Sequence, residues 1–140
     1  MLKSLHHVPL PLLPRALDEV HRVLRPHGLL YVSEPVFAGE LNEVMRLFHD
    51  EEQVRAAALG ALRDALATGA WEQVTEYQFG VPVSYRNFAQ FEQRLIGVTY
   101  LDHQLDAATR DKVRANFERH MTADGAHFVR PMRVNLLRRC

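Results

Sequence analysis

The stretch that decides the fold is Ser4–Glu34, SLHHVPLPLLPRALDEVHRVLRPHGLLYVSE. Pro14 can begin a helix, because the N–H that proline lacks would be unpaired in a first turn anyway. Pro26 and Gly28 end that helix, and the unbroken apolar run 29–32 is typical of a strand covered on both faces. Apolar residues recur at helical spacing between these signals: Ala16, Leu17, Val20, Val23 and Leu24. The stretch therefore predicts a helix followed by a buried strand.

Two later segments, 38–68 and 87–123, also carry apolar residues at helical spacing. Side-chain oxygens of Asn and Asp can accept from the unpaired N–H groups of a first helical turn. We therefore expect Asp50 to cap a helix in the first segment, and Asn87 and Asp106 to cap two helices in the second.

Alternation of apolar and polar residues predicts two further strands, 72–85 and 128–138. Pro82 favours a sheet edge for the first of them, because proline cannot donate to a strand ladder. Residues 1–5 are compatible with the end of another buried strand. The predicted order is β-α-β-α-α-β-α-α-β, in one α/β domain over residues 1–140.

The overall composition excludes several classes of partner. Seventeen basic and seventeen acidic side chains cancel, so nothing indicates nucleic-acid binding. The longest unbroken apolar run is only a few residues, far short of the roughly 20 that a membrane helix needs. Cys140 is the single cysteine and can form no internal disulfide, which favours a reducing, cytoplasmic location.

The segments SLHHVP, ALDEVHRVLRPHG and LLYVSEP resemble the second half of class I S-adenosylmethionine-dependent methyltransferases of type 11. In that family the fourth strand ends in a polar segment that often contains Leu-His-His. A basic-Val-Leu-basic-Pro-Gly-Gly turn then leads to the fifth strand; here the turn is 22–28, with His27 where a glycine is usual. The resemblance implies a partial Rossmann-like methyltransferase sheet of strands 4-5-7-6, whose last strand is antiparallel. It also implies that 87–123 forms a lid over the substrate.

The resemblance implies a site around the two adjacent histidines. Ser4, Leu5 and His6 would lie near the methionine part of S-adenosylmethionine, and His7 could orient or deprotonate a nucleophile. Glu34, at the end of the next strand, would face the same cleft as a second catalytic residue, since open α/β sheets bind ligands at the carboxyl ends of their strands. The alternatives are that the histidines pack against the helix or cap a backbone group, and that Glu34 is a solvated carboxylate.

The substrate side is predicted at Tyr85, Arg86 and His103. Aromatic residues could wall a pocket for a small-molecule methyl acceptor, although such spacing is equally typical of a core: Trp71, Tyr77, Phe79, Tyr85, Phe88 and Phe91. No His-Glu-x-x-His motif and no cysteine pair occurs, so no metal site is predicted. The nucleophile elbow of hydrolases is absent as well.

One departure from the family is severe, because no Gly-x-Gly turn occurs among the seven glycines. That turn lets the backbone approach the cofactor closely. We expect a gene start placed at an internal methionine or a truncated gene, in preference to a partner half on a separate chain. We also expect this chain alone to be inactive and not to bind S-adenosylmethionine measurably. The alternative function is a non-catalytic module that forms a homodimer or higher oligomer through the exposed edge of its N-terminal strand.

Overall fold

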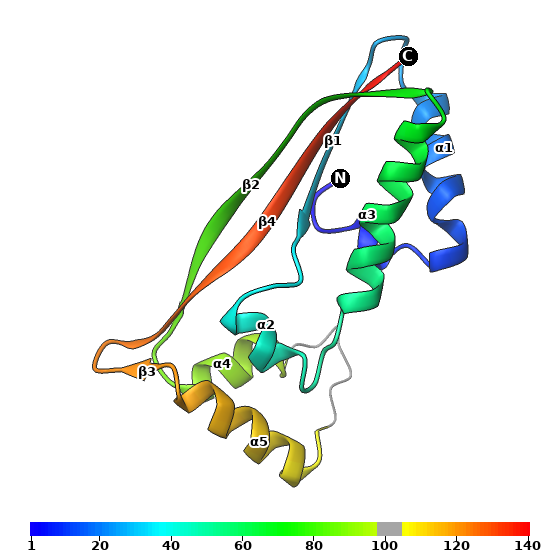
Figure 1. The fold of residues 1–140 in the computed structure, drawn as a ribbon. Helices are drawn as coiled ribbons and strands as arrows, with labels where there is room; N and C mark the ends of the chain where they lie inside the picture. The colour runs from blue at the N-terminus through cyan, green and yellow to red at the C-terminus, as the bar shows by residue number, and fades with distance from the viewer. Residues whose placement is uncertain (98–104) are drawn as a thin grey trace. The chain divides into compact units, whose positions relative to one another are not determined.

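The structure is a computed structural model that describes residues 1–97 and 105–140 (Figure 1). Its contacts divide the chain into two compact units, each described here by itself. Unit 1 comprises Met1–Phe37, Glu51–Gly80 and Pro131–Cys140, and unit 2 comprises Ala38–Asp50 and Val81–Arg130. Folding of residues 1–140 as a single domain stays a prediction.

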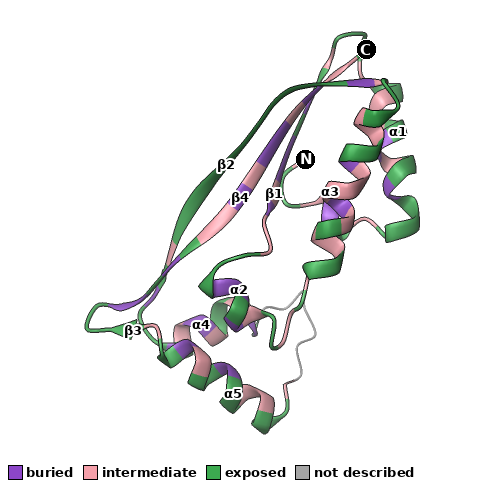
Figure 2. Ribbon diagram, viewed as in Figure 1, coloured by how far each residue is buried: buried purple, intermediate pink, exposed green. Residues whose placement is uncertain are grey.

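The sheet is built on a central strand from the C-terminal end of the chain. Strand β4 (Gly125–Arg139) lies between β1 (Leu29–Pro35) and β2 (Trp71–Tyr85). Strands β1 and β4 are antiparallel, with a register that runs from Leu29 opposite Arg138 to Pro35 opposite Met132. Strand β2 ends the strand order, as Pro82 indicated, and Figure 2 shows it exposed along almost its whole length.

The N-terminal residues lie on the other side of β1. Leu2 forms a parallel bridge with Ser33, and the Lys3 N–H donates to the Ser33 carbonyl oxygen at 2.8 Å. The spatial order is therefore the N-terminal segment, β1, β4 and β2, with β4 antiparallel to β1. This is the predicted 4-5-7-6 order, and it confirms the methyltransferase-like fold class.

Two helices of unit 1, α1 (Leu13–Val23) and α3 (Glu52–Ala67), lie side by side on one face of the sheet (Figure 1). Two short 3-10 turns, Leu5–His7 and Leu10–Leu12, precede α1. The core between these layers is mostly aliphatic: Leu5, Leu13, Leu17, Leu30, Val32, Ala58, Leu62, Trp71 and Leu137. The apolar residues predicted at helical spacing in 38–68 supply the buried face of α3, with Ala58 and Leu62 at its centre.

The turn between α1 and β1 explains why glycines are usual there. His27 has a φ of +62°, in the left-handed region where glycine is the least strained residue. A Cβ on Gly28 would lie 2.8 Å from the Arg25 carbonyl oxygen, closer than van der Waals contact allows. Glycine is therefore required by the available space at position 28, whereas His27 adopts a strained backbone conformation.

Unit 2 contains α2 (Glu40–Met45), α4 (Phe88–Leu95) and α5 (Ala107–Glu118), and the two-residue strand β3 (Met121–Thr122) that pairs with β4. Its core is largely aromatic: Tyr85, Phe88, Phe91, Phe117 and Phe128, with Leu41, Val44, Ile96, Val113 and Ala126.

Two of the three predicted helix caps are confirmed. Asn87 Oδ1 accepts from the Gln90 N–H at 3.0 Å, and Asp106 Oδ1 accepts from the Thr109 N–H at 2.6 Å. The third prediction, Asp50, is wrong. The N-cap of α3 is Glu51, whose side chain makes no capping bond because its carboxylate pairs with the arginine one turn ahead.

No helix within the described residues is both long and apolar enough to cross a membrane.

Candidate functional site

The candidate site begins where two parallel segments end together. The N-terminal segment leaves the sheet after its bridge at Leu2 and turns through the 3-10 turn Leu5–His7. Glu34 occupies the corresponding end of β1. Carboxyl ends of neighbouring parallel strands meet at one edge of a sheet, which is the usual ligand edge of open α/β folds.

Glu34 ties these two ends together. Its Oε1 accepts from the backbone N–H groups of Ser4 and Leu5, at 2.9 Å each, and its Oε2 contacts His6 Nδ1. Burial raises the pKa of the Glu34 carboxyl group, but hydrogen bonds from His6, Leu5 and Ser4, with the charge of His6, hold that pKa below its ordinary value. Glu34 is therefore an ionised acceptor of several hydrogen bonds.

The contact with Glu34 also fixes the state of the His6 ring. An ionised carboxylate can only accept, so the proton between the two groups lies on His6 Nδ1. In the neutral ring, Nε2 then carries a lone pair. The side chain of His6 is only 4% exposed, and Nε2 lies 3.7 Å from Oε1 of Glu51.

Glu51 is held in turn from α3. Arg55, one turn along, donates from Nη2 to Glu51 Oε2 at 2.6 Å and from Nε to the same oxygen at 3.1 Å. Both side chains are largely buried, at 12% and 10% exposure. The second carboxylate oxygen, Oε1, is directed towards His6.

His7 completes the cluster and is its exposed member. Its ring lies 4.1 Å from the ring of His6, centroid to centroid, with a tilt of 41°. One ligand atom from each of His6, His7 and Glu51 lies within 4.8 Å of the other two. The two histidines thus differ in setting: His6 is buried and oriented, whereas His7 faces solvent.

The structure brings five of the predicted site residues together: Ser4, Leu5, His6, His7 and Glu34. Glu51 and Arg55, which belong to the same cluster, were not predicted from the sequence. A Glu and an Arg four residues apart at the start of a helix were visible in the sequence, but only the fold brings them beside His6.

The predicted substrate residues belong to unit 2. Tyr85 is 3% exposed, and its ring packs against Phe91, Phe117 and Phe128 at centroid distances of 5.2 to 6.2 Å, so it is part of the core. The backbone N–H of Arg86 donates to Gln90 Oε1 at 2.8 Å, and its side chain is exposed. The third residue, His103, lies outside the described residues.

The other aromatic residues also divide between core and surface. Phe88 and Phe91 belong to the unit 2 core, and Trp71 belongs to the unit 1 core. Tyr77 and Phe79 are exposed on β2, with ring centroids 6.1 Å apart. The core interpretation therefore holds for the buried aromatics, and these two exposed rings do not join them.

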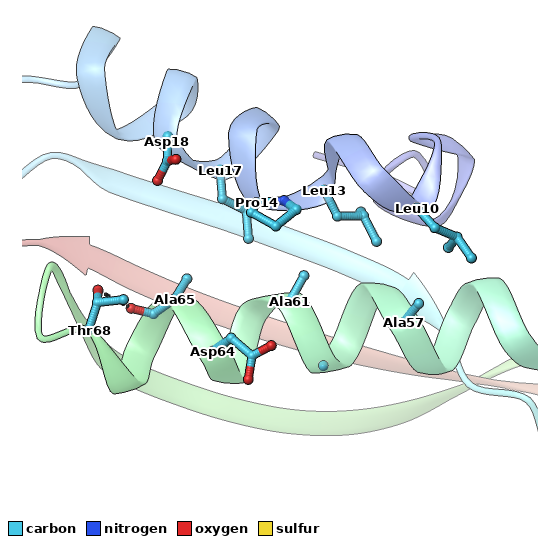
Figure 3. Close-up of a pocket in the computed structure, with 11 residues that line it drawn as sticks. Leu10, Leu13, Pro14, Leu17, Asp18, Ala57, Ala61, Asp64, Ala65 and Thr68 are labelled. Carbon is cyan, nitrogen blue, oxygen red and sulfur yellow. Dashed lines mark hydrogen bonds between the residues drawn. The ribbon is translucent and has the colours of Figure 1, made fainter.

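A separate cavity of about 400 Å³ lies between α1 and α3 (Figure 3). Leu10, Leu13 and Leu17 line one side, and small residues of α3 line the other. Asp18 and Asp64 are the acidic residues of its lining. None of the predicted site residues borders this cavity.

Comparison with known proteins supports the fold. No protein-family model matches the chain, and no curated protein does. Among solved structures, a candidate methyltransferase of Bacillus halodurans C-125 matches 98% of this chain with a TM-score of 0.57 and 12% sequence identity. The match covers 66% of that structure's chain, so the present chain spans just under two thirds of its length. The likeness shows a methyltransferase-like fold.

Proposed function

We propose that this chain contributes to the transfer of a methyl group from S-adenosylmethionine to a small molecule. The observation that carries the proposal is the junction of two parallel segments through Glu34, which bonds Ser4, Leu5 and His6 at the ligand edge of the sheet. The fold that this chain shares with a candidate methyltransferase supports it.

The contacts suggest a division of roles within the cluster. Glu34 has its hydrogen-bonding capacity engaged and its pKa lowered, so it is better suited to position the loop than to remove a proton. His7 is exposed, and we assign it the task of orienting or deprotonating the acceptor. His6, buried beside it, would face the methionine part of the donor.

The cluster fits one wall of a donor site. The backbone N–H groups of Ser4 and Leu5 already donate to Glu34. Polar contacts with the donor would therefore come from the histidine rings and from backbone carbonyl groups. The Gly-x-Gly turn that would allow close approach to the rest of the donor does not occur in this sequence. When bound, S-adenosylmethionine would supply the electrophilic methyl group, and the chain's residues would orient the acceptor.

A binding experiment tests this proposal on the chain itself. We expect S-adenosylhomocysteine at millimolar concentration to shift the backbone amide NMR signals of residues 4–7, Glu34 and Val36, with no binding measurable by calorimetry at micromolar concentrations. Glu34→Gln should reduce the shifts because it loosens the loop. Glu72→Gln, which removes an exposed partner of Arg138, is the matched control and should leave them unchanged.

Shifts scattered over both units, or none at all, would contradict a donor site at this edge. Micromolar affinity would instead contradict the expectation that this chain, without a glycine-rich turn, does not bind the donor measurably.

A second candidate function is assembly, which the exposed apolar surface of unit 1 favours. Leu2 is 69% exposed in the N-terminal segment, and Leu29, Tyr31 and Tyr77 are each at least 41% exposed on the sheet. The hydrogen bond between the tyrosines, which raises the pKa of Tyr77, places two of these side chains on one face. We propose that a second copy of the chain pairs along the exposed edge of the N-terminal segment and forms a homodimer.

Light scattering tests the assembly. A homodimer should dissociate on Leu2→Lys, because a charge at the strand edge opposes pairing. Val23→Lys changes an equally exposed apolar residue on α1 and should leave the mass unchanged. A monodisperse monomer for the unaltered chain would exclude this function.

A further inference from the structure

We propose that His6, His7 and Glu51 form a binding site for a divalent first-row transition metal such as Zn²⁺. The proposal goes beyond methyl transfer and depends on the cluster geometry alone. Two imidazoles and one carboxylate are a ligand set that proteins use for zinc, with a further coordination position left for water or substrate.

The distances suit such a site. Two ligand atoms that each lie 2.0 to 2.1 Å from a tetrahedral metal are about 3.3 Å apart. His6 Nε2 and Glu51 Oε1 are already 3.7 Å apart, and the three ligand atoms lie within 4.8 Å of one another. His7 is exposed, so its ring can turn towards the other two ligands without disturbing the core.

The surroundings orient two of the three ligands. Metal-binding histidines usually donate their other ring N–H to a carboxylate, which fixes the tautomer and raises the basicity of the ligand nitrogen. His6 Nδ1 contacts Glu34 in this way, so Nε2 is directed at the proposed site. Arg55 bonds Glu51 Oε2 and leaves Oε1 directed towards His6.

The charges are also compatible with a divalent cation. Glu34 and Glu51 contribute two negative charges, and Arg55 contributes one positive charge. Both carboxylates are largely buried, where solvent screens charge only weakly. A divalent cation bound beside them would be attracted by their negative charge.

The metal site and the base role of His7 exclude each other at any one moment. A histidine whose lone pair is donated to a metal cannot also accept a proton. A bound metal could itself lower the pKa of a hydroxyl that enters its open coordination position. Metal binding is therefore measured without the methyl donor, so that its failure and the failure of methyl transfer are separate results.

The test is calorimetric titration of the complete chain, without a polyhistidine tag, with ZnCl₂ near neutral pH. We expect one site per chain. His7→Ala and Glu51→Gln should each weaken binding at least tenfold. His127→Ala removes another exposed histidine, on β4 in unit 2, and should leave the affinity unchanged.

A second variant distinguishes zinc binding at this oriented cluster from nonspecific zinc binding to surface histidines. Glu34→Gln changes no ligand, but it should weaken binding by roughly 10- to 100-fold, because it removes the carboxylate that orients His6. Visible absorption of the Co²⁺ complex would report the same loss as a weaker or altered band. The proposal is overturned if zinc fails to bind at one equivalent, or if the His7 and His127 variants lose affinity equally.

Discussion

The two compact units of this protein have cores of different composition. Unit 1 packs aliphatic side chains between a sheet and two helices, and it carries the buried cluster of His6, Glu34 and Glu51 at the edge of that core. Among the core residues that the structure describes in unit 2, the buried side chains are largely aromatic, and Tyr85 is the one that is ionisable.

The two cores differ in whether they include ionisable groups that could take part in a reaction. Ionisable groups that are buried and mutually bonded have a cost in desolvation that a purely structural core avoids. Unit 1 bears that cost at the ligand edge of its sheet. In unit 2, burial raises the pKa of the Tyr85 hydroxyl, so this residue stays neutral among its aromatic neighbours. The candidate chemistry therefore belongs to unit 1.

The largest expected effect comes from a cavity made in one core while the stability of both units is followed. Phe91 is fully buried, and Phe91→Ala should destabilise the protein by about 3–5 kcal/mol through the lost burial and the cavity it leaves. Hydrogen exchange should accelerate in α4 and α5 more than in α3. Leu137→Ala in the unit 1 core is the reciprocal variant. Equal acceleration in all three helices would show one cooperative domain.

A matched pair of glycine substitutions should act in opposite directions. Gly125 in unit 2 has a φ of +105°, and a Cβ there would lie 2.5 Å from the Tyr85 carbonyl oxygen, so Gly125→Ala should cost at least about 1–3 kcal/mol. Gly60 lies inside α3 of unit 1 with open space around it. Gly60→Ala should stabilise by about 0.5–1 kcal/mol. Thermal unfolding checks both signs.

Glu34→Gln tests how far unit 1 depends on its polar cluster. The amide can no longer accept from three donors at once, so part of the buried N–H groups of Ser4, Leu5 and His6 loses its partner. We expect a loss of about 1–3 kcal/mol, measured by denaturant unfolding with Trp71 fluorescence. Glu72→Gln should lower the free energy of unfolding by less than half of this amount. Equal losses would show that the cluster does not stabilise unit 1 more than an exposed ion pair does.

The smallest expected effect belongs to the ion pair of Glu92 and Arg110 in unit 2. Hydrogen bonding from Arg110 lowers the pKa of Glu92 below the ordinary value of 4.5. The pair therefore stabilises the folded state above about pH 4.5, and this contribution disappears as the pH falls through the lowered pKa. Because both groups are partly exposed, Glu92→Gln should cost only about 0–1 kcal/mol at pH 7. Denaturant unfolding at pH 7 and at a series of lower pH values measures it; a difference that does not shrink as the pH falls below about 4.5 would contradict this origin.

Local patterns in the sequence predicted most elements of the fold. Hydrophobic periodicity and the residues that begin or end an element depend only on neighbours in the sequence. The helices, the strands and the caps at Asn87 and Asp106 could therefore be predicted directly. Asp50 was wrong as a cap, because α3 begins one residue later, after Glu51, whose carboxylate accepts from Arg55 and caps no backbone N–H. The strand order followed from the resemblance around 4–34.

The sequence by itself determined the helix and the buried strand of Ser4–Glu34, because helix period, proline and glycine all act over a few residues. Only the tertiary structure decided what meets at its end. Glu34 is 28 residues from His6, and Glu51 is 45, so no local pattern joins them. The parallel bridge at Leu2 and the packing of α3 bring them together, and hydrogen bonds and charge then fix the state of each group.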